Sequence, residues 1–367
     1  MILLGLEAEQ FRNIVSARLE PSPGLNVLCG NNGQGKTNLL EAVWLLTGGK
    51  SFRGAKDADL IRRGESFSVL EARTGDSERQ KSLRLTIGSA KSGRPGRYIR
   101  VNGADRGRAG MAAGEFTAVV FAPEHLGLAK GSPAGRRRFL DAALCQLYPG
   151  YLGALRRYTR LVAQKNALLK AWQKTPGAAD MLEVFDEQLA GCGAQVTRRR
   201  AEYLSVLVPL AEQNYAEISR GSETMRLCYR PAFDPALGED GLRQAIRAMR
   251  PAELRAGCCL AGPHREDFSI QIAGQDARAF ASQGQQRSAV LSLKLAEAAC
   301  AAVITGEHPV LLLDDVLSEL DATRQEYLLT HVEGRQAFVT ACDPAAFLHT
   351  DGRVYTMRGG EVSLRQQ

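Results

Sequence analysis

The chain has 367 residues, of which 44% are hydrophobic and 24% are charged, and its formal net charge is +7. These values are ordinary for a soluble globular protein with a large core, and they exclude a low-complexity chain. The lack of any run of about 20 apolar residues argues against a membrane span. The positive charge favours an anionic partner such as nucleic acid, and the eight scattered cysteines form no C-x-x-C pair and suit a reducing cytosol.

The N-terminal segment is predicted to be rich in strands. Residues 1–7 are an apolar run without the basic start and cleavage site of a signal peptide, so they predict a strand. Residues 67–72 and 83–87 alternate between apolar and polar side chains, which also predicts strands. Residues 97–101 lead into Asn102-Gly103, a pair typical of a tight β-hairpin turn.

A phosphate-binding loop stands between a predicted strand and a predicted helix. Residues 30–37 fit the pattern G-x-x-x-x-G-K-[ST], and they lie between an apolar run at 25–29 and an apolar helix at 38–46. Backbone N–H groups of such a loop surround phosphate oxygens, and the helix N-terminus adds a positive field. We expect Lys36 to neutralise the β- and γ-phosphates of ATP and the Thr37 hydroxyl to bind Mg²⁺. The loop residues expected to bind nucleotide are Gly30, Asn31, Asn32, Gly33, Gln34, Gly35, Lys36, Thr37 and Asn38.

The middle of the chain differs in character from its two ends. After a short apolar run at 116–121, predicted to be a buried strand, the pattern is helical from about residue 133 to residue 256. The predicted helices are 136–148, 152–172, 181–218 and 241–249. The C-terminal segment is predicted to alternate between strands at 268–272, 309–313 and 336–340 and helices at 284–304 and 321–331, before a hairpin at 354–362. The sequence therefore predicts an α/β fold in two halves, residues 1–120 and 261–367, interrupted by a mostly helical insertion at 121–260.

The strand at 309–313 runs into Asp314 and Asp315, which is a Walker B pattern. We expect Asp314 to serve Mg²⁺ and Asp315 to orient an attacking water molecule. Buried strands often end in aspartate, so the pattern by itself is weak. Downstream of a phosphate-binding loop, a magnesium site is the stronger interpretation.

Residues 281–287, Ala-Ser-Gln-Gly-Gln-Gln-Arg, open the helix before this strand. Ser282 is a good N-cap and Gly284 allows an anion to approach, although a capped helix start explains the local pattern equally well. The order of phosphate loop, insertion, Ser-Gln-Gly-Gln-Gln turn, Walker B and residues 318–321 is similar to the ATP-binding-cassette superfamily. This resemblance implies an ATPase head built on a mixed sheet. It also implies a homodimer in which the turn of one copy, a signature motif, caps the γ-phosphate of ATP bound by the other.

Seven segments resemble the RecF family of bacterial recombination mediators, and they span nearly the whole chain. They are residues 11–13, 30–38, 50–53, 121–124, 131–141, 262–265 and 282–287. The resemblance implies a cytoplasmic, ATP-dependent dimer that binds double-stranded DNA near single-strand gaps. It also implies cooperation with RecR and RecO in loading RecA, and a weak, DNA-dependent ATPase whose slow hydrolysis resets the clamp.

The resemblance also implies roles for individual residues. It gives catalytic roles to Lys36, Asp315 and Gln285, metal binding to Thr37 and Asp314, and nucleotide contacts outside the loop to Arg12, Ser282, Gly284 and Gln286. The chain departs from the superfamily pattern at two positions. Asp315 stands where most cassettes have glutamate, and Thr340 stands near the place of the usual switch histidine.

Arginine occurs in clusters that could contact DNA. They are Arg62-Arg63, Lys91 with Arg94, Arg97 and Arg100, Arg106 with Arg108, 136–138, Arg156-Arg157 with Arg160, and 198–200. One cluster alone is more often a solvated helix face, but several in one ATPase favour phosphate contacts. No helix-turn-helix or zinc finger is visible, so the expected binding is sequence-neutral and strongly salt-dependent. His264, beside Arg265, is a candidate ligand that is more often structural in such a turn.

Three alternatives remain open from the sequence. The ATPase subunit of a membrane transporter would also dimerise on ATP, but the basic insertion and the missing switch histidine argue against it. An SMC-like chromosome protein would need a far longer heptad arm than residues 121–260 supply. A scaffold with a vestigial nucleotide site would bind ATP without hydrolysing it.

Overall fold

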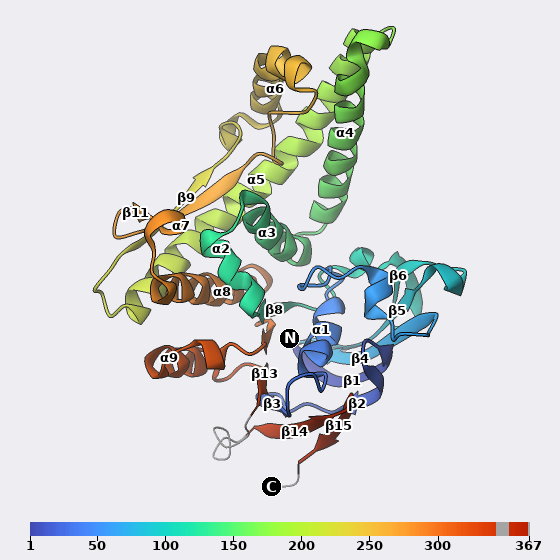
Figure 1. The fold of residues 1–367 in the computed structure, drawn as a ribbon, viewed down its shortest axis with the longest axis vertical. Helices are drawn as coiled ribbons and strands as arrows, with labels where there is room; N and C mark the ends of the chain where they lie inside the picture. Colours follow the sequence, from blue (N-terminus) through green and yellow to red (C-terminus); the bar gives the residue numbers. More distant parts are fainter. Residues whose placement is uncertain (343–351, 366–367) are drawn as a thin grey trace.

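The computed structural model describes residues 1–342 and 352–365. Figure 1 shows two six-stranded sheets in the lower part of the molecule and an elongated, mainly helical part above them. Strands from both ends of the chain meet in one of these sheets, as the sequence predicts. The insertion between them rises away from the sheets as α4 and α5 (Figure 1).

The mixed sheet carries the strands that precede the two ATP motifs. Its order is β15-β14-β3-β13-β12-β8, and every neighbouring pair is parallel except β14 with β15. The strands are β3 (Leu25–Cys29), β8 (Ala118–Phe121), β12 (Val310–Leu313), β13 (Ala337–Ala341), β14 (Arg353–Arg358) and β15 (Glu361–Leu364). Because β13 pairs with both β3 and β12, the carboxyl ends of these three strands lie side by side.

The second sheet is antiparallel, with the order β2-β1-β4-β5-β6-β7. Its strands are β1 (Ile2–Phe11), β2 (Ile14–Leu19), β4 (Phe67–Gly75), β5 (Gln80–Gly88), β6 (Gly96–Val101) and β7 (Ala104–Arg108). The turn between β6 and β7 confirms the predicted hairpin, because Asn102 and Gly103 have φ values of 50° and 79°. Positive φ at both central residues is the requirement of a type I′ turn.

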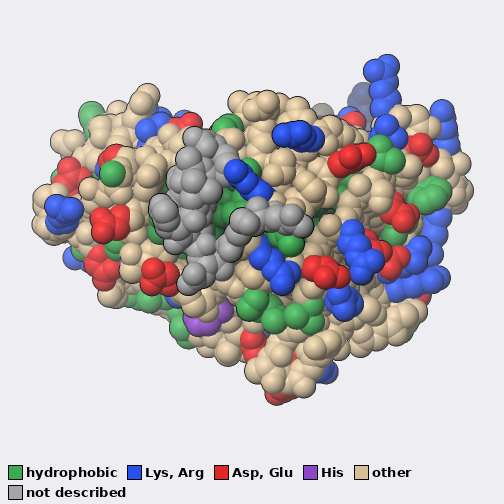
Figure 2. Space-filling model, turned by 90° about the horizontal axis from the view of Figure 1, so that it is seen from below, with side chains coloured by type: hydrophobic (Ala, Val, Ile, Leu, Met, Phe, Trp, Pro, Cys, Tyr) green, Lys and Arg blue, Asp and Glu red, His purple; other side chains and the backbone are tan. Residues whose placement is uncertain are grey.

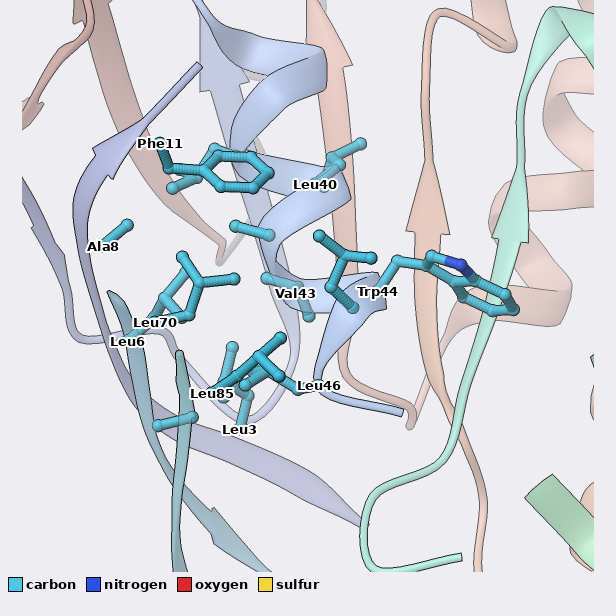
Figure 3. Packing of buried hydrophobic residues seen from close by; sticks show 14 of the residues in the cluster. Leu3, Leu6, Ala8, Phe11, Leu40, Val43, Trp44, Leu46, Leu70 and Leu85 are labelled. Carbon is cyan, nitrogen blue, oxygen red and sulfur yellow. The ribbon is translucent and has the colours of Figure 1, made fainter. Parts of the chain in front are cut away.

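Helix α1 (Lys36–Leu45) lies between the two sheets and starts at the phosphate loop. Figure 3 shows Val43 and Leu46 pointing toward Leu3, Leu70 and Leu85 of the antiparallel sheet, and all five side chains are fully buried. Burying one such side chain contributes about 2 kcal/mol. This packing holds the C-terminal part of α1 against the antiparallel sheet, and the phosphate loop leads directly into the other end of the helix.

The insertion contains the four predicted helices. Its helices are α2 (Gly127–Lys130), α3 (Pro133–Leu147), α4 (Tyr151–Ala171), α5 (Ala178–Ile218) and α6 (Gly238–Ala256). The sequence analysis did not predict β9 (Met225–Arg230), which pairs with β10 (Asp267–Ile272) in a sheet completed by β11 (Gln275–Asp276). Only Met225 and Leu227 of β9 are buried, a repeat too short to identify a strand from sequence. Because β10 lies beyond residue 260 and β9 before it, this sheet crosses the predicted boundary, and the domain limits stay a prediction.

Three helices complete the fold: α7 (Ala277–Phe280), α8 (Gln283–Thr305) and α9 (Ala322–Val332). By length and hydropathy, α8 could cross a membrane, but 72% of its most apolar window is buried inside the protein. Its apolar side chains pack against α5 and α3 in one hydrophobic cluster. We therefore interpret α8 as a core helix.

Buried ion pairs hold the base of the insertion together. The guanidinium of Arg200 is 2% exposed and lies 2.8 Å from Asp141 and 2.9 Å from Glu266. Arg136 is also buried and forms a pair of 2.7 Å with Asp267. Two arginines from the predicted DNA-binding clusters are therefore structural. Their positions could not be separated from surface arginines by sequence, because each partner lies far along the chain.

The structure also gives His264 a structural environment. One ring nitrogen, Nδ1, lies 2.5 Å from the Tyr158 hydroxyl, and the other lies 3.1 Å from the backbone oxygen of Cys259. Burial lowers the pKa of His264.

We predict that Arg200→Met lowers the free energy of unfolding by about 3–5 kcal/mol, because it leaves the buried Glu266 carboxylate and the partly buried Asp141 carboxylate without their cation. The matched control is Arg198→Met, since Arg198 is 59% exposed and lies 3.9 Å from Glu202. This control should change the unfolding free energy by less than about 0.5 kcal/mol. Urea denaturation of both variants measures the difference, and equal losses would contradict the structural role of Arg200.

Candidate nucleotide-binding site

The phosphate loop has the backbone conformation that its glycines allow. Gly30, Gly33 and Gly35 have φ values of 150°, 79° and 112°. At Gly30 a side chain would also clash, because a Cβ atom there would lie 2.5 Å from the backbone oxygen of Met357. Since α1 begins at Lys36, the N–H groups of its first residues have no acceptor within the helix and are available to phosphate oxygens.

The Lys36 ammonium lies over the loop. Its Nζ donates hydrogen bonds to the backbone oxygens of Gly30, at 2.6 Å, and Asn31, at 3.1 Å. The loop therefore holds the cation against its own backbone, where the β- and γ-phosphates of a nucleotide are expected.

The turn between β14 and β15 donates two hydrogen bonds to the phosphate loop. The N–H of Gly359 donates to Oε1 of Gln34 at 2.5 Å, and the N–H of Gly360 donates to the backbone oxygen of Gln34 at 3.0 Å. Sequence reasoning assigned Gln34 to nucleotide binding and did not connect it to this hairpin. No local signal could have done so, because more than 300 residues separate the partners.

Thr37, in the first turn of α1, meets Asp314, which directly follows β12. The Thr37 hydroxyl donates to Oδ1 of Asp314 at 2.8 Å, and the Thr340 hydroxyl approaches the same oxygen at 3.1 Å. Burial raises the pKa of Asp314, and the two hydroxyl groups act in the opposite direction. A hydroxyl and a buried carboxylate in contact are the oxygen ligands that Mg²⁺ prefers, so the residues present fit this ion.

Asp315 is exposed beside this pair and has a φ of 51°, which is unusual for a residue other than glycine. Its backbone N–H donates to the Thr340 hydroxyl at 2.8 Å, and its carboxylate accepts a hydrogen bond of 2.8 Å from Ser318. Thr340 therefore links the backbone of Asp315 to the carboxylate of Asp314. Thr340, which stands near the place of the usual switch histidine, thus contacts both Asp314 and Asp315. The sequence analysis did not predict these two contacts.

Arg12 lies next to α1, but its guanidinium is paired with Glu41. Its Nε and Nη2 donate to the two carboxylate oxygens of Glu41 at 2.8 and 3.0 Å, and the Ser51 hydroxyl also donates to Glu41. Glu41 is fully buried, and a buried carboxylate needs a cationic partner. Arg12 supplies it, which explains a charged residue on the buried face of α1. Contact between Arg12 and phosphate stays a prediction.

Beside the loop, Asn38, which the sequence assigns to nucleotide binding, contacts two polar residues that it did not assign, Asn13 and Arg53. The Asn38 side chain donates to Oδ1 of Asn13 at 2.8 Å and accepts a hydrogen bond of 3.0 Å from Nη1 of Arg53. Asn13 in turn donates to the backbone oxygen of Gly33 at 3.4 Å. Asn13 and Arg53 belong to two of the segments that carried the family resemblance, 11–13 and 50–53, and that resemblance was the available signal.

The signature turn forms a complete helix cap. The N–H of Gln285 donates to the Ser282 hydroxyl at 3.2 Å, and the N–H of Ser282 donates to Oε1 of Gln285 at 2.8 Å. The Gln286 side chain is buried and donates to the backbone oxygen of Ala281 at 2.5 Å. These bonds do not use the Ser282 hydroxyl proton or the N–H groups of Gln283 and Gly284. These three donors at the start of α8 are therefore available to bind an anion.

The chain is similar to known proteins along nearly its whole length. The family described as "RecF/RecN/SMC N terminal domain" matches residues 2–360. A protein named DNA replication and repair protein RecF from Symbiobacterium thermophilum is 40% identical over 383 aligned positions, covering 99% of this chain and 98% of its own. A protein of the same name from Heliobacterium modesticaldum is 39% identical, with 99% of both chains covered. The chain belongs to the RecF family.

Solved structures agree with this assignment. A structure described as the recombination mediator protein RecF-ATP in the RecFOR pathway superposes with a TM-score of 0.90 at 34% identity, covering 99% of this chain and 97% of that chain. The Smc head domain of Pyrococcus furiosus superposes with a TM-score of 0.56 at 15% identity, which shows the fold alone. The predicted ABC-type ATPase head with a helical insertion is therefore confirmed.

For this RecF family member we predict that Thr340→Val lowers the free energy of unfolding by about 1–3 kcal/mol, because it leaves the Asp315 N–H without its acceptor. ATP hydrolysis should fall as well, since both acids lose a fixed partner. The control is Thr330→Val on α9, where the exposed hydroxyl bonds only within its own helix. Urea denaturation and phosphate release measure the two effects, and unchanged stability would contradict the role of Thr340.

Proposed function

We propose that the protein is an ATP-dependent dimer that binds double-stranded DNA in recombinational repair and hydrolyses ATP slowly. The observation that carries the proposal is the contact of Thr37 with Asp314, which joins the phosphate loop to the Walker B strand. Relatives of similar length are named DNA replication and repair protein RecF, and a solved relative is described with ATP in the RecFOR pathway. Bound Mg²⁺ would supply charge neutralisation at the phosphates.

Each copy would bind one ATP through its own loop and cap the ATP of its partner. Lys36 and the N–H groups at the start of α1 hold the β- and γ-phosphates. The Ser282 hydroxyl and the start of α8 approach the γ-phosphate from the other copy. Because the phosphate loop of one copy and the signature turn of the other contact the same triphosphate, ATP binding stabilises the dimer.

Asp315 would orient the attacking water, and its geometry favours a slow reaction. An aspartate side chain is one methylene shorter than the glutamate of most cassettes. Its carboxylate is also held by Ser318, at 2.8 Å, which limits its reach. Slow hydrolysis would let the clamp persist on DNA and then reset it.

The DNA-binding surface proposed here runs from β6 and β7 to the base of α4. Arg100 and Arg106 are exposed on the hairpin, and Arg156 and Arg160 are exposed on α4. Arg156 connects the two groups, because its Nη2 lies 2.8 Å from the position of a Cβ atom on Gly110, just after β7. Figure 2 shows basic side chains gathered on the side where Figure 1 places β5 and β6. Such a surface binds phosphates without reading bases.

The further partners of the proposal come from the relatives. RecR, together with RecO and RecA, would act with this protein in the cytoplasm at gaps next to duplex DNA. The pathway named for the solved relative supports this part.

We predict that wild type becomes a dimer with ATP and that Lys36→Met remains a monomer, because the triphosphate then loses its main cation. The control is Lys174→Met, which removes an exposed lysine after α4. Light scattering with and without ATP measures the mass. A wild-type dimer of equal strength without nucleotide would contradict the ATP-dependent clamp.

We also predict that Arg106→Gln lowers affinity for duplex DNA several-fold, equally for all sequences, and reduces the dependence of log affinity on log salt concentration by about one unit. The matched control is Arg226→Gln, because Arg226 is 69% exposed but lies on β9, on the opposite side of Figure 1. Fluorescence anisotropy at several salt concentrations measures both variants. Equal losses of DNA affinity in the two variants would contradict a DNA-binding surface at the β6–β7 hairpin.

A further inference from the structure

A carboxylate from the insertion holds the signature turn. Glu223 lies between α5 and β9, and its Oε1 accepts a hydrogen bond of 2.8 Å from Nε2 of Gln285. Its Oε2 accepts one of 2.9 Å from the hydroxyl of Tyr215. Because Oε1 of Gln285 already accepts from the N–H of Ser282, the Gln285 side chain is used at both ends.

The insertion anchors Glu223 firmly. Tyr215 is buried near the end of α5, where burial, followed by the Glu223 carboxylate, raises the pKa of its hydroxyl, so that it remains a hydrogen-bond donor. Asn214 donates to the backbone oxygen of Ser292 on α8 at 3.1 Å, which ties this end of α5 to the signature helix. The Ser219 hydroxyl donates to the backbone oxygen of Glu223 at 3.1 Å. Glu223 is therefore fixed through both its side chain and its backbone.

We propose that Glu223 is a positioning residue of the signature turn and the point at which the insertion holds that turn. The inference rests on the proposed function, in which the turn caps ATP bound by the partner copy. By engaging Gln285, Glu223 keeps the side-chain amide away from phosphate and leaves that contact to Ser282 and the N–H groups at the start of α8. Helix α5 spans 41 residues from the far end of the insertion to this point, so a displacement of α5 is passed to the turn.

The test compares Glu223→Ala with the conservative Glu223→Gln. We expect Glu223→Ala to weaken ATP-dependent dimerisation about tenfold and to lower kcat, because the turn loses a charge-assisted hydrogen bond. Affinity of the monomer for a fluorescent ATP analogue, measured well below the dimerisation concentration, should stay within about twofold, because the turn does not contribute to the loop of its own copy. Glu223→Gln retains an oxygen that accepts from Gln285 and should restore both dimerisation and kcat.

Two further variants separate positioning from general stability. Glu212→Ala removes another carboxylate that holds the same region, through the N–H of Leu227 at 3.1 Å and Arg226 at 2.8 Å, and it should leave dimerisation unchanged. If Glu223 acts through Gln285, the double variant Glu223→Ala/Gln285→Ala should be no worse than Gln285→Ala.

Light scattering across an ATP titration distinguishes the possible failures. A wild type that dimerises with ATP while Glu223→Ala dimerises equally well, or loses no more than Glu212→Ala, overturns this inference alone. Failure of Glu223→Gln to restore dimerisation overturns it too. A wild type that does not dimerise with ATP overturns the proposed function and the inference with it.

Discussion

The ATP site depends on the position of β13 between β3 and β12 in the mixed sheet. Parallel pairing on both sides of β13 brings the carboxyl ends of three strands into one line. Thr37, Asp314 and Thr340 then meet within hydrogen-bond distance, although 277 residues separate the first two. A shift of one residue in the pairing of β13 would turn the Thr340 side chain to the other face of the sheet, so this contact requires the observed strand register.

The charged residues of the insertion have two roles, one in buried ion pairs and one on the exposed surface. Arg200, Arg136 and Glu266 are buried and their ion pairs hold its base, whereas the arginines of α4 remain exposed near the β6–β7 hairpin. Removing one partner of a buried pair is far more damaging than removing an exposed charge, because the remaining ion has lost its water. The insertion can therefore be rigid enough to hold the signature turn through Glu223 while it presents a basic surface to solvent.

The site residues that the sequence identified share one property. Lys36, Thr37 and Asp314 each follow a recognisable apolar strand, and the chemistry of a phosphate loop depends on local spacing. The contacts that the sequence missed join distant segments: Gln34 with the β14–β15 turn, Arg12 with Glu41, and Gln285 with Glu223. The hydrogen-bonding capacity of these side chains was visible, but their partners could not be chosen without the fold.

The sequence by itself determined the alternation of strands and helices, the presence of a mostly helical insertion in an α/β fold, and the glycine pattern of the phosphate loop. It could do so because apolar periodicity and glycine-dependent turns are local properties of the chain. The tertiary structure alone decided which arginines are buried, that β9 pairs with β10, and that Thr340 connects the two Walker B acids. Burial and pairing depend on packing between segments that lie far apart along the chain, so only the folded protein specifies them.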